Sequence, residues 1–133
     1  MARRVTPSKI APPFGRYAHG VEIAKNARIV RTSGQLGVLP DGTVPASVGA
    51  QSAACLSNIE AVLEAAGMTR ADIVHLTAFV TKREDMPAYM AARDAFLASM
   101  EEPPASTLLI VSGFTREEFL VEVEAMAVRE PAS

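Results

Sequence analysis

The segment from Ser47 to Gly67 constrains the fold of this chain more than any other. Its apolar residues recur at steps of three and four and form one stripe of a helix: Cys55, Leu56, Ile59, Val62, Leu63 and Ala66. Its polar residues fall mostly on the other side: Gln51, Ser57, Glu60 and Glu64. Ser47 provides an N-cap oxygen, and Gly67 can adopt the left-handed conformation that ends a helix. A stripe this wide predicts a helix that lies on a β-sheet.

Alternating apolar and polar residues predict the strands of that sheet. The predicted strands are Tyr17–Ile23, Ala27–Ser33, Ile73–Thr81, Thr107–Val111 and Phe119–Arg129. A turn at Lys25-Asn26 is expected to join the first two as a hairpin, after an extended arm over residues 1–14. A second helix is predicted over Asp85–Met100, with Pro87 in its first turn. The order ββ–α–β–α–ββ predicts an α+β fold, with a crossover where a long helix joins two strands.

Length and composition narrow the class of protein. A chain of 133 residues is expected to form one domain, residues 1–133. No apolar run approaches the roughly 20 residues that cross a membrane, and the start of the chain lacks the apolar core of a signal peptide. A single cysteine, Cys55, cannot form an internal disulfide, which favours a cytoplasmic location. The net charge of −2 argues against binding to nucleic acid.

The last predicted strand has two different faces. One face is apolar: Val121, Val123, Ala125 and Ala127. The other face is mixed: Leu120, Glu122, Glu124, Met126 and Val128. If the helices cover the apolar face, we expect the mixed face to be buried against other subunits.

Spacing alone reveals no catalytic constellation. His19 and His75 fall on separate predicted strands without nearby cysteine or acidic ligands, so no metal site is predicted. His19 either lines a cleft or is an ordinary polar residue. Glu122 and Glu124 lie side by side, where charge and burial can raise the pKa of one, although exposed pairs of carboxylates are common.

Several stretches, in this order and at these spacings, resemble the RidA/YjgF family (reactive intermediate deaminase A, also called endoribonuclease L-PSP). They are Ala11-Pro12 with Gly15-Arg16-Tyr17, Thr32-Ser33-Gly34-Gln35, Gln51, Asn58 to Gly67, Pro104-Ala105, and Val121 to Ala127. The resemblance implies a chorismate-mutase-like α+β fold, a mixed sheet with two helices on one face. It also implies a homotrimer around a central barrel, with small organic ligands bound between subunits. We expect neither a cofactor nor a metal.

The best-known activity of that family is hydrolysis of imines and enamines, such as 2-aminoacrylate, to 2-oxo acids and ammonia. By resemblance, Tyr17, Ser33 and Gly34 line the cleft, and Glu122 places or activates water. The family's deaminases hold the substrate carboxylate with an arginine directly after the Pro-Ala pair, where this chain has Ser106. A serine hydroxyl cannot replace a charged, bidentate guanidinium.

Two more positions of the resemblance depart from the deaminases. Met90 replaces an asparagine on the second helix, and Arg93 replaces the usual tyrosine. Both share a helix face, so Arg93 is one candidate for the missing charge, and Arg16 is the other.

Three functions therefore remain in view. The first is an imine or enamine deaminase of altered substrate range, which does not act on typical 2-aminoacrylate. The second is a non-catalytic trimer that binds or senses a metabolite. RNA cleavage, suggested by the family's older name, is the weakest because the chain is acidic and has no stripe of aromatic and basic residues.

Overall fold

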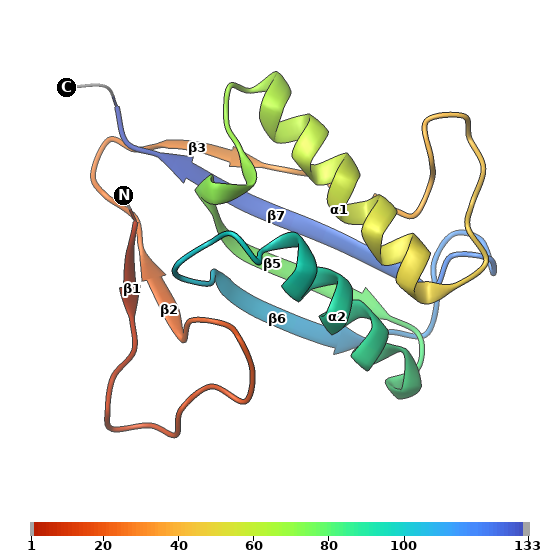
Figure 1. Ribbon diagram of the computed structural model, residues 1–133, viewed down its shortest axis with the longest axis horizontal. Helices are drawn as coiled ribbons and strands as arrows, with labels where there is room; N and C mark the ends of the chain where they lie inside the picture. The colour runs from red at the N-terminus through yellow and green to blue at the C-terminus, as the bar shows by residue number, and fades with distance from the viewer. Residues whose placement is uncertain (1, 132–133) are drawn as a thin grey trace.

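The computed structural model describes residues 2–131 and shows a mixed β-sheet with two helices on one face (Figure 1). The helices are α1 (Val48–Ala65) and α2 (Met86–Phe96). The strands are β1 (Arg3–Val5), β2 (Gly20–Glu22), β3 (Arg28–Arg31), β4 (Gln35–Leu36), β5 (Ile73–Val80), β6 (Ala105–Ile110) and β7 (Val121–Arg129). Short 3₁₀ turns, Arg70–Asp72 and Arg83–Asp85, precede β5 and α2. The α+β fold predicted from the sequence is confirmed.

The main sheet has the strand order β3-β7-β5-β6, and β4 pairs with the first part of β7. Strands β5 and β6 pair in parallel, with α2 as their crossover, whereas β7 runs antiparallel to β3, β4 and β5. Since β4 and β5 both run antiparallel to β7, the long helix α1 connects two parallel strands that have β7 between them. The strand β7 therefore lies inside the sheet and has pairing partners along both edges.

The predicted hairpin is wrong. A turn does form, because the amide of Ala27 donates to the Ala24 carbonyl at 3.2 Å and Asn26 has a φ of 66°. However, β2 pairs with β1, which comes from the predicted arm, and β3 pairs with β7. Strand β2 is three residues long, and the equally short β1 matches it. The longer apolar strand β7 offers β3 a full register, so tertiary pairing overrides the local turn signal.

The apolar stripe of α1 packs on β7, as predicted. Cys55, Leu56, Ile59 and Leu63 are at most 1% exposed and share one core with Val121, Val123, Ala125 and Ala127. Two residues of α1 were assigned to the wrong side. Val62, at the margin of the stripe, is 38% exposed, and Gln51 is fully buried because it lies one turn before Cys55 on the same face.

Gln51 ties three segments of the chain together from inside the core. Its side-chain amide donates to the carbonyls of Pro45 and Glu118 at 2.8 Å each, and its oxygen accepts from the amide of Leu120 at 2.9 Å. The backbone of Gly37 lies so close that a Cβ there would be 2.6 Å from Cβ of Gln51. This one side chain thus links α1 to the loops before it and before β7.

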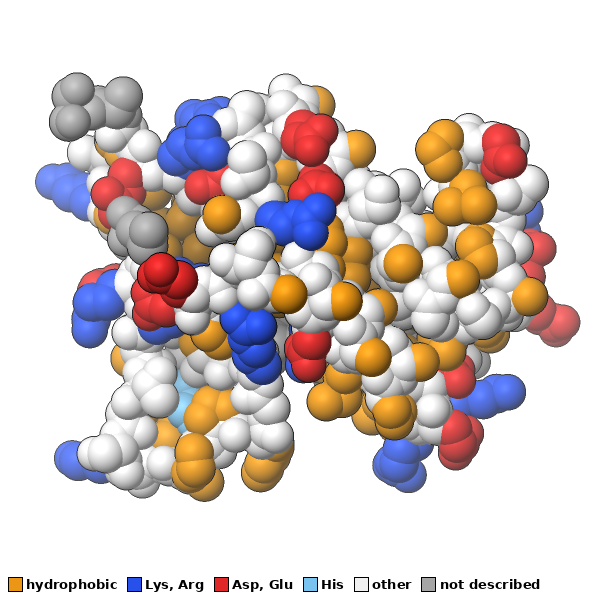
Figure 2. Space-filling view, viewed as in Figure 1, with side chains coloured by type: hydrophobic (Ala, Val, Ile, Leu, Met, Phe, Trp, Pro, Cys, Tyr) orange, Lys and Arg blue, Asp and Glu red, His pale blue; other side chains and the backbone are white. Residues whose placement is uncertain are grey.

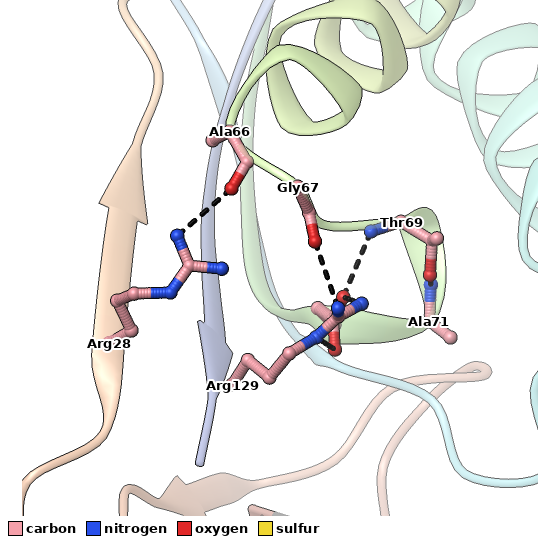
Figure 3. Close-up of polar contacts among 7 residues, drawn as sticks. Arg28, Ala66, Gly67, Thr69, Ala71 and Arg129 are labelled. Atoms are coloured by element: carbon pink, nitrogen blue, oxygen red, sulfur yellow. Dashed lines mark hydrogen bonds and ion pairs between the residues drawn. The ribbon is translucent and has the colours of Figure 1, made fainter. Parts of the chain in front are cut away.

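Two arginines hold the carboxyl end of α1 against the sheet (Figure 3). Arg129 of β7 donates to the carbonyl of Gly67 at 2.8 Å and pairs with the carboxylate of Asp72 at 2.6 Å. Arg28 of β3 donates to the Ala66 carbonyl at 2.9 Å. Gly67 has the expected left-handed φ of 75°, and the helix begins as predicted, with Ser47 as its N-cap.

Helix α2 ends at Phe96, earlier than the predicted Met100. Its apolar spacing continues to Met100, and both Leu97 and Met100 are buried. The segment after Phe96 closes as a turn, with the amide of Met100 donating to the Leu97 carbonyl at 3.0 Å, and Pro103 and Pro104 follow this turn. Spacing therefore identified the buried residues but not the end of the helix.

Within residues 2–131, none of the helices has the length and apolar character that a membrane crossing requires. On the helix-bearing face, Lys and Arg side chains alternate with Asp and Glu side chains instead of gathering in one patch (Figure 2). This face has no basic footprint of the kind that binds phosphate backbones.

Replacing Gln51 with leucine should destabilise the protein strongly. The change removes three hydrogen bonds and leaves two carbonyls and one amide without a partner in the interior, which costs about 2–4 kcal/mol of unfolding free energy. Urea denaturation would measure the loss. Gln35→Leu is the matched control, since that side chain makes one hydrogen bond, to the Ser33 carbonyl. Equal midpoints for the two variants would contradict the structural role of Gln51.

The thiol of Cys55 should be inert in the folded protein. Burial, together with the negative charge of Glu122, raises the pKa of this thiol to about 12. At pH 8 only about one thiol in 10⁴ is then ionised, and the thiolate is the reactive form. We expect no labelling by Ellman's reagent in native buffer and complete labelling in urea. Rapid labelling of native protein would show that α1 opens frequently from the sheet.

Candidate functional site

The seven predicted site residues form two groups on opposite faces of the sheet. On β6, Ser106 pairs in register with Leu76 of β5, which faces the helices. On β7, Glu122 pairs with Phe79, which faces away from them. Successive residues of a strand alternate between faces, so Ser106 and Glu122 point to opposite sides of one sheet. A single chain does not bring the two groups together.

The first group is the arginine cluster, in which Met90, Arg93 and Ser106 lie together with Gly15. Tyr17 follows Gly15 by two residues, and its hydroxyl accepts from the amide of Phe14 at 3.2 Å. At the centre of the cluster is the guanidinium of Arg93 on α2, a residue that is 3% exposed. Its Nη1 donates to Oγ of Ser106 at 3.3 Å, and its Nε donates to Oδ1 of Asp94 at 3.1 Å. Its Nη2 is buried and has no hydrogen-bond partner among the described residues.

A segment near the amino terminus covers this arginine. A Cβ at Gly15 would lie 4.0 Å from both Nη2 of Arg93 and Cε of Met90. The amide of Tyr17 donates to the Gly15 carbonyl at 3.0 Å, and the amide of Ala18 donates to the carbonyl of Pro104 at 2.9 Å. The segment from Gly15 to Ala18 therefore runs beside the start of β6, where Ser106 lies.

Arg16, the other candidate for the missing charge, does not contact Ser106. Its Nη2 donates instead to the carbonyl of Met100, in the turn that follows α2. Of the two arginines considered from the sequence, the structure brings Arg93 to Ser106.

The second group is the glutamate hollow, in which Glu122 lies beside the backbone of Gly34. A Cβ at Gly34 would be 2.5 Å from Oε2 of Glu122, so only glycine fits there without moving the carboxylate. The half-buried Glu122 lines an open cavity of about 410 Å³ together with Leu36, Gly113, Phe114 and Thr115. Ser33 is exposed and directly precedes Gly34. This group presents a carboxylate to an open space, as placement of a water molecule requires.

The remaining polar candidates have structural partners. Nε2 of His19 lies 2.7 Å from the carbonyl of Ala11, and its ring meets that of Tyr17 edge-on at 6.1 Å. On the open face, Nε2 of His75 lies 3.2 Å from Oγ1 of Thr107, and Glu124 pairs with Arg31 at 3.5 Å. In residues 2–131, no group of three or more His, Cys, Asp or Glu side chains is placed to hold a metal ion.

Sequence reasoning assigned no role to three residues around Arg93. Tyr89 is fully buried one turn before Arg93, with its ring centroid 6.0 Å from the guanidinium carbon. Burial raises the pKa of Tyr89, so its hydroxyl stays neutral. Asp94 supplies the carboxylate at Nε, and Gly15 leaves the space over Nη2. The i, i+4 spacing of Tyr89 and Arg93 was visible in the sequence, but nothing there showed that the arginine is buried.

Comparison with known proteins identifies the family of this chain. The family model described as Endoribonuclease L-PSP matches residues 8–129. The 2-iminobutanoate/2-iminopropanoate deaminase of Escherichia coli is 34% identical over 131 residues, which cover 97% of this chain and 99% of the deaminase.

Two solved structures extend the comparison. The Rid family protein YyfB of Yersinia pestis superimposes with a TM-score of 0.83 at 30% identity, covering 95% of this chain and 97% of YyfB. Escherichia coli TdcF with bound serine gives a TM-score of 0.73 at 29% identity, covering 96% of this chain and all of TdcF (100%). Because the family model spans most of the chain and relatives match along their whole length, the chain belongs to the RidA/YjgF family, also named for endoribonuclease L-PSP.

Proposed function

We propose that this protein binds a small imine or enamine in a cleft shared by neighbouring protomers and hydrolyses it to a carbonyl compound and ammonia. The observation that carries the proposal is the division of the site. The arginine cluster offers donors for an anion, and the glutamate hollow offers a carboxylate for water, but one sheet separates them. A homotrimer of the kind that the family resemblance implies would supply the two groups from different chains.

The half-buried Glu122 suits the hydrolytic step. Its carboxylate accepts a proton from water as the oxygen bonds to the imine carbon and the imine nitrogen gains a proton. The tetrahedral intermediate then loses its hydroxyl proton while the nitrogen gains another, and the C–N bond breaks to release ammonia. Water and imine are thereby converted to carbonyl compound and ammonia, with no other reactant.

Ser106 supports an altered substrate range. A charge-assisted hydrogen-bond pair between an arginine and the substrate carboxylate contributes about 1.5–3 kcal/mol to binding. This chain has Ser106 in place of that arginine. At about 1.4 kcal/mol for each tenfold, its loss lowers kcat/KM for small 2-imino acids by about one to two orders of magnitude. We therefore propose that small imines of the 2-aminoacrylate type are poor substrates.

Kinetics with 2-iminobutanoate, generated in place by an amino-acid oxidase, test this function. We expect wild-type kcat/KM to be at least about tenfold below that of the E. coli deaminase. Ser106→Arg alone should recover little, because the new guanidinium would lie beside that of Arg93. The double variant Ser106→Arg with Arg93→Tyr should recover more. Equal rates for wild type and the deaminase would refute the altered range, and no turnover in any variant would favour a metabolite-binding protein.

The shared cleft predicts complementation between two inactive variants. Ser106→Asp places a negative charge where the substrate's acid group binds, and Glu122→Gln removes the carboxylate that activates water. If the two groups come from different chains, random mixing should restore about a quarter of the sites. We would unfold the two proteins together, refold them, and measure both activity and mass by light scattering. A monomer, or an inactive mixed oligomer, would contradict the shared cleft.

A further inference from the structure

Arg93 is an unusual buried residue because part of its hydrogen-bonding capacity is unused. A guanidinium has five N–H donors, and here Nε and Nη1 have acceptors while the buried Nη2 has none among residues 2–131. Buried polar groups nearly always find a partner, since leaving one unpaired is costly. An arginine kept in this state calls for a partner that is not part of the chain.

The charge of this arginine is only partly balanced by its surroundings. Its ion-pair partner is Asp94, whose side chain is 47% exposed, while the arginine side chain is 4% exposed. Water therefore weakens the field of the acid more than that of the guanidinium. The ring of Tyr89, 6.0 Å away, lies at the outer limit of a cation–π contact. A positive field thus remains at Nη2, which favours an anionic partner.

Ser106 gives the same place a second donor. Its oxygen accepts from Nη1 of Arg93 at 3.3 Å, which leaves the hydroxyl hydrogen free to point elsewhere. A carboxylate beside the pair could accept one hydrogen bond from Nη2 and one from the hydroxyl. One donor comes from α2 and the other from β6. The long side chain that the family's deaminases have at the position of Ser106 is therefore not needed to bind the carboxylate.

We infer that Arg93, with Ser106 as its partner, is the specificity-determining residue that holds the acid group of this protein's ligand. The inference rests on the proposed function for the rest of the ligand, an imino or oxo acid other than the small 2-aminoacrylate type. The guanidinium extends from α2 toward the hydroxyl of Ser106 on β6. The ligand's carboxylate is thus held by one charged donor and one neutral donor instead of a bidentate fork.

Access to Nη2 lies under the segment that contains Gly15. Gly15 has no side chain, and the neighbouring Phe14 is 98% exposed, so this stretch contributes little to the core. Beyond Gly15 the segment is attached to the body of the protein by Arg16, which donates to the carbonyl of Met100, and by Ala18, whose amide donates to the carbonyl of Pro104. A small shift of the backbone at Gly15 would admit a carboxylate without disturbing the sheet.

Calorimetry with 2-oxobutanoate, and with its uncharged analogue 2-oxobutanamide, tests the inference without catalysis. Wild type should bind the acid at least about tenfold more tightly than the amide, the difference expected for a charged hydrogen bond. Arg93→Gln should abolish this preference, Arg93→Lys should keep part of it, and Ser106→Ala should reduce it a few-fold. Arg83→Gln, at an exposed arginine before the same helix, should leave it unchanged.

A preference that survives in folded Arg93→Gln, or a wild type without one, would overturn the inference. Should Arg93→Gln fail to fold, Ser106→Asp replaces it as the test, because its carboxylate would occupy the guanidinium and exclude the ligand. Circular dichroism establishes folding in each case. The outcome for the proposed function is separate. If the preference for the acid depends on Arg93 but the protein does not hydrolyse imines, the inference holds and the proposed function fails. If the protein hydrolyses imines at a rate that depends neither on the charge of the substrate nor on Arg93, the proposed function holds and the inference fails.

Discussion

The packing of α1 on β7 is the contact on which the rest of this structure depends. Strand β7 pairs with β3, β4 and β5, and its inward residues, Val121 and Val123 among them, are fully buried under the stripe of α1. Alternation then obliges Glu122 and Glu124 to face the other side. The core and the carboxylate of the candidate site therefore lie on opposite faces of β7. The strand register that buries Val121 and Val123 also determines the position of Glu122.

The two halves of the candidate site are built in different ways. Glu122 belongs to the inner strand of a sheet, with the Gly34 backbone against its carboxylate. Arg93 belongs to a helix and is buried between Tyr89, Ser106 and the segment at Gly15. This placement of an acid and a cation on opposite faces of one sheet is the observation that supports the proposed cleft between protomers.

Periodicity predicted the elements whose residues pack locally, and it failed where distant segments compete. The α1 stripe and the alternation of β5 and β7 followed from spacing of a few residues. The hairpin failed because β7, about a hundred residues from β3, offers the better partner. Gln51 was misassigned because its amide is paired by loops that no local pattern reveals.

Motif resemblance, not spacing, selected the site residues. It identified the substitutions at Met90, Arg93 and Ser106, yet left Arg93 and Arg16 as equal candidates. The choice between them depends on where α2 ends and turns, which places Arg16 against Met100 and Arg93 against Ser106.

The close approach of Gly34 to Glu122 also limits how this site can change over generations. Any side chain at position 34 would meet the carboxylate, whose Oε2 lies 2.5 Å from where a Cβ would be. A substitution at position 34 would therefore force the Glu122 side chain into another rotamer, which moves the carboxylate. Such a change would weaken any reaction that depends on the present position of the acid. Such a pair is expected to stay fixed among descendants that keep the chemistry, and to change together in those that abandon it.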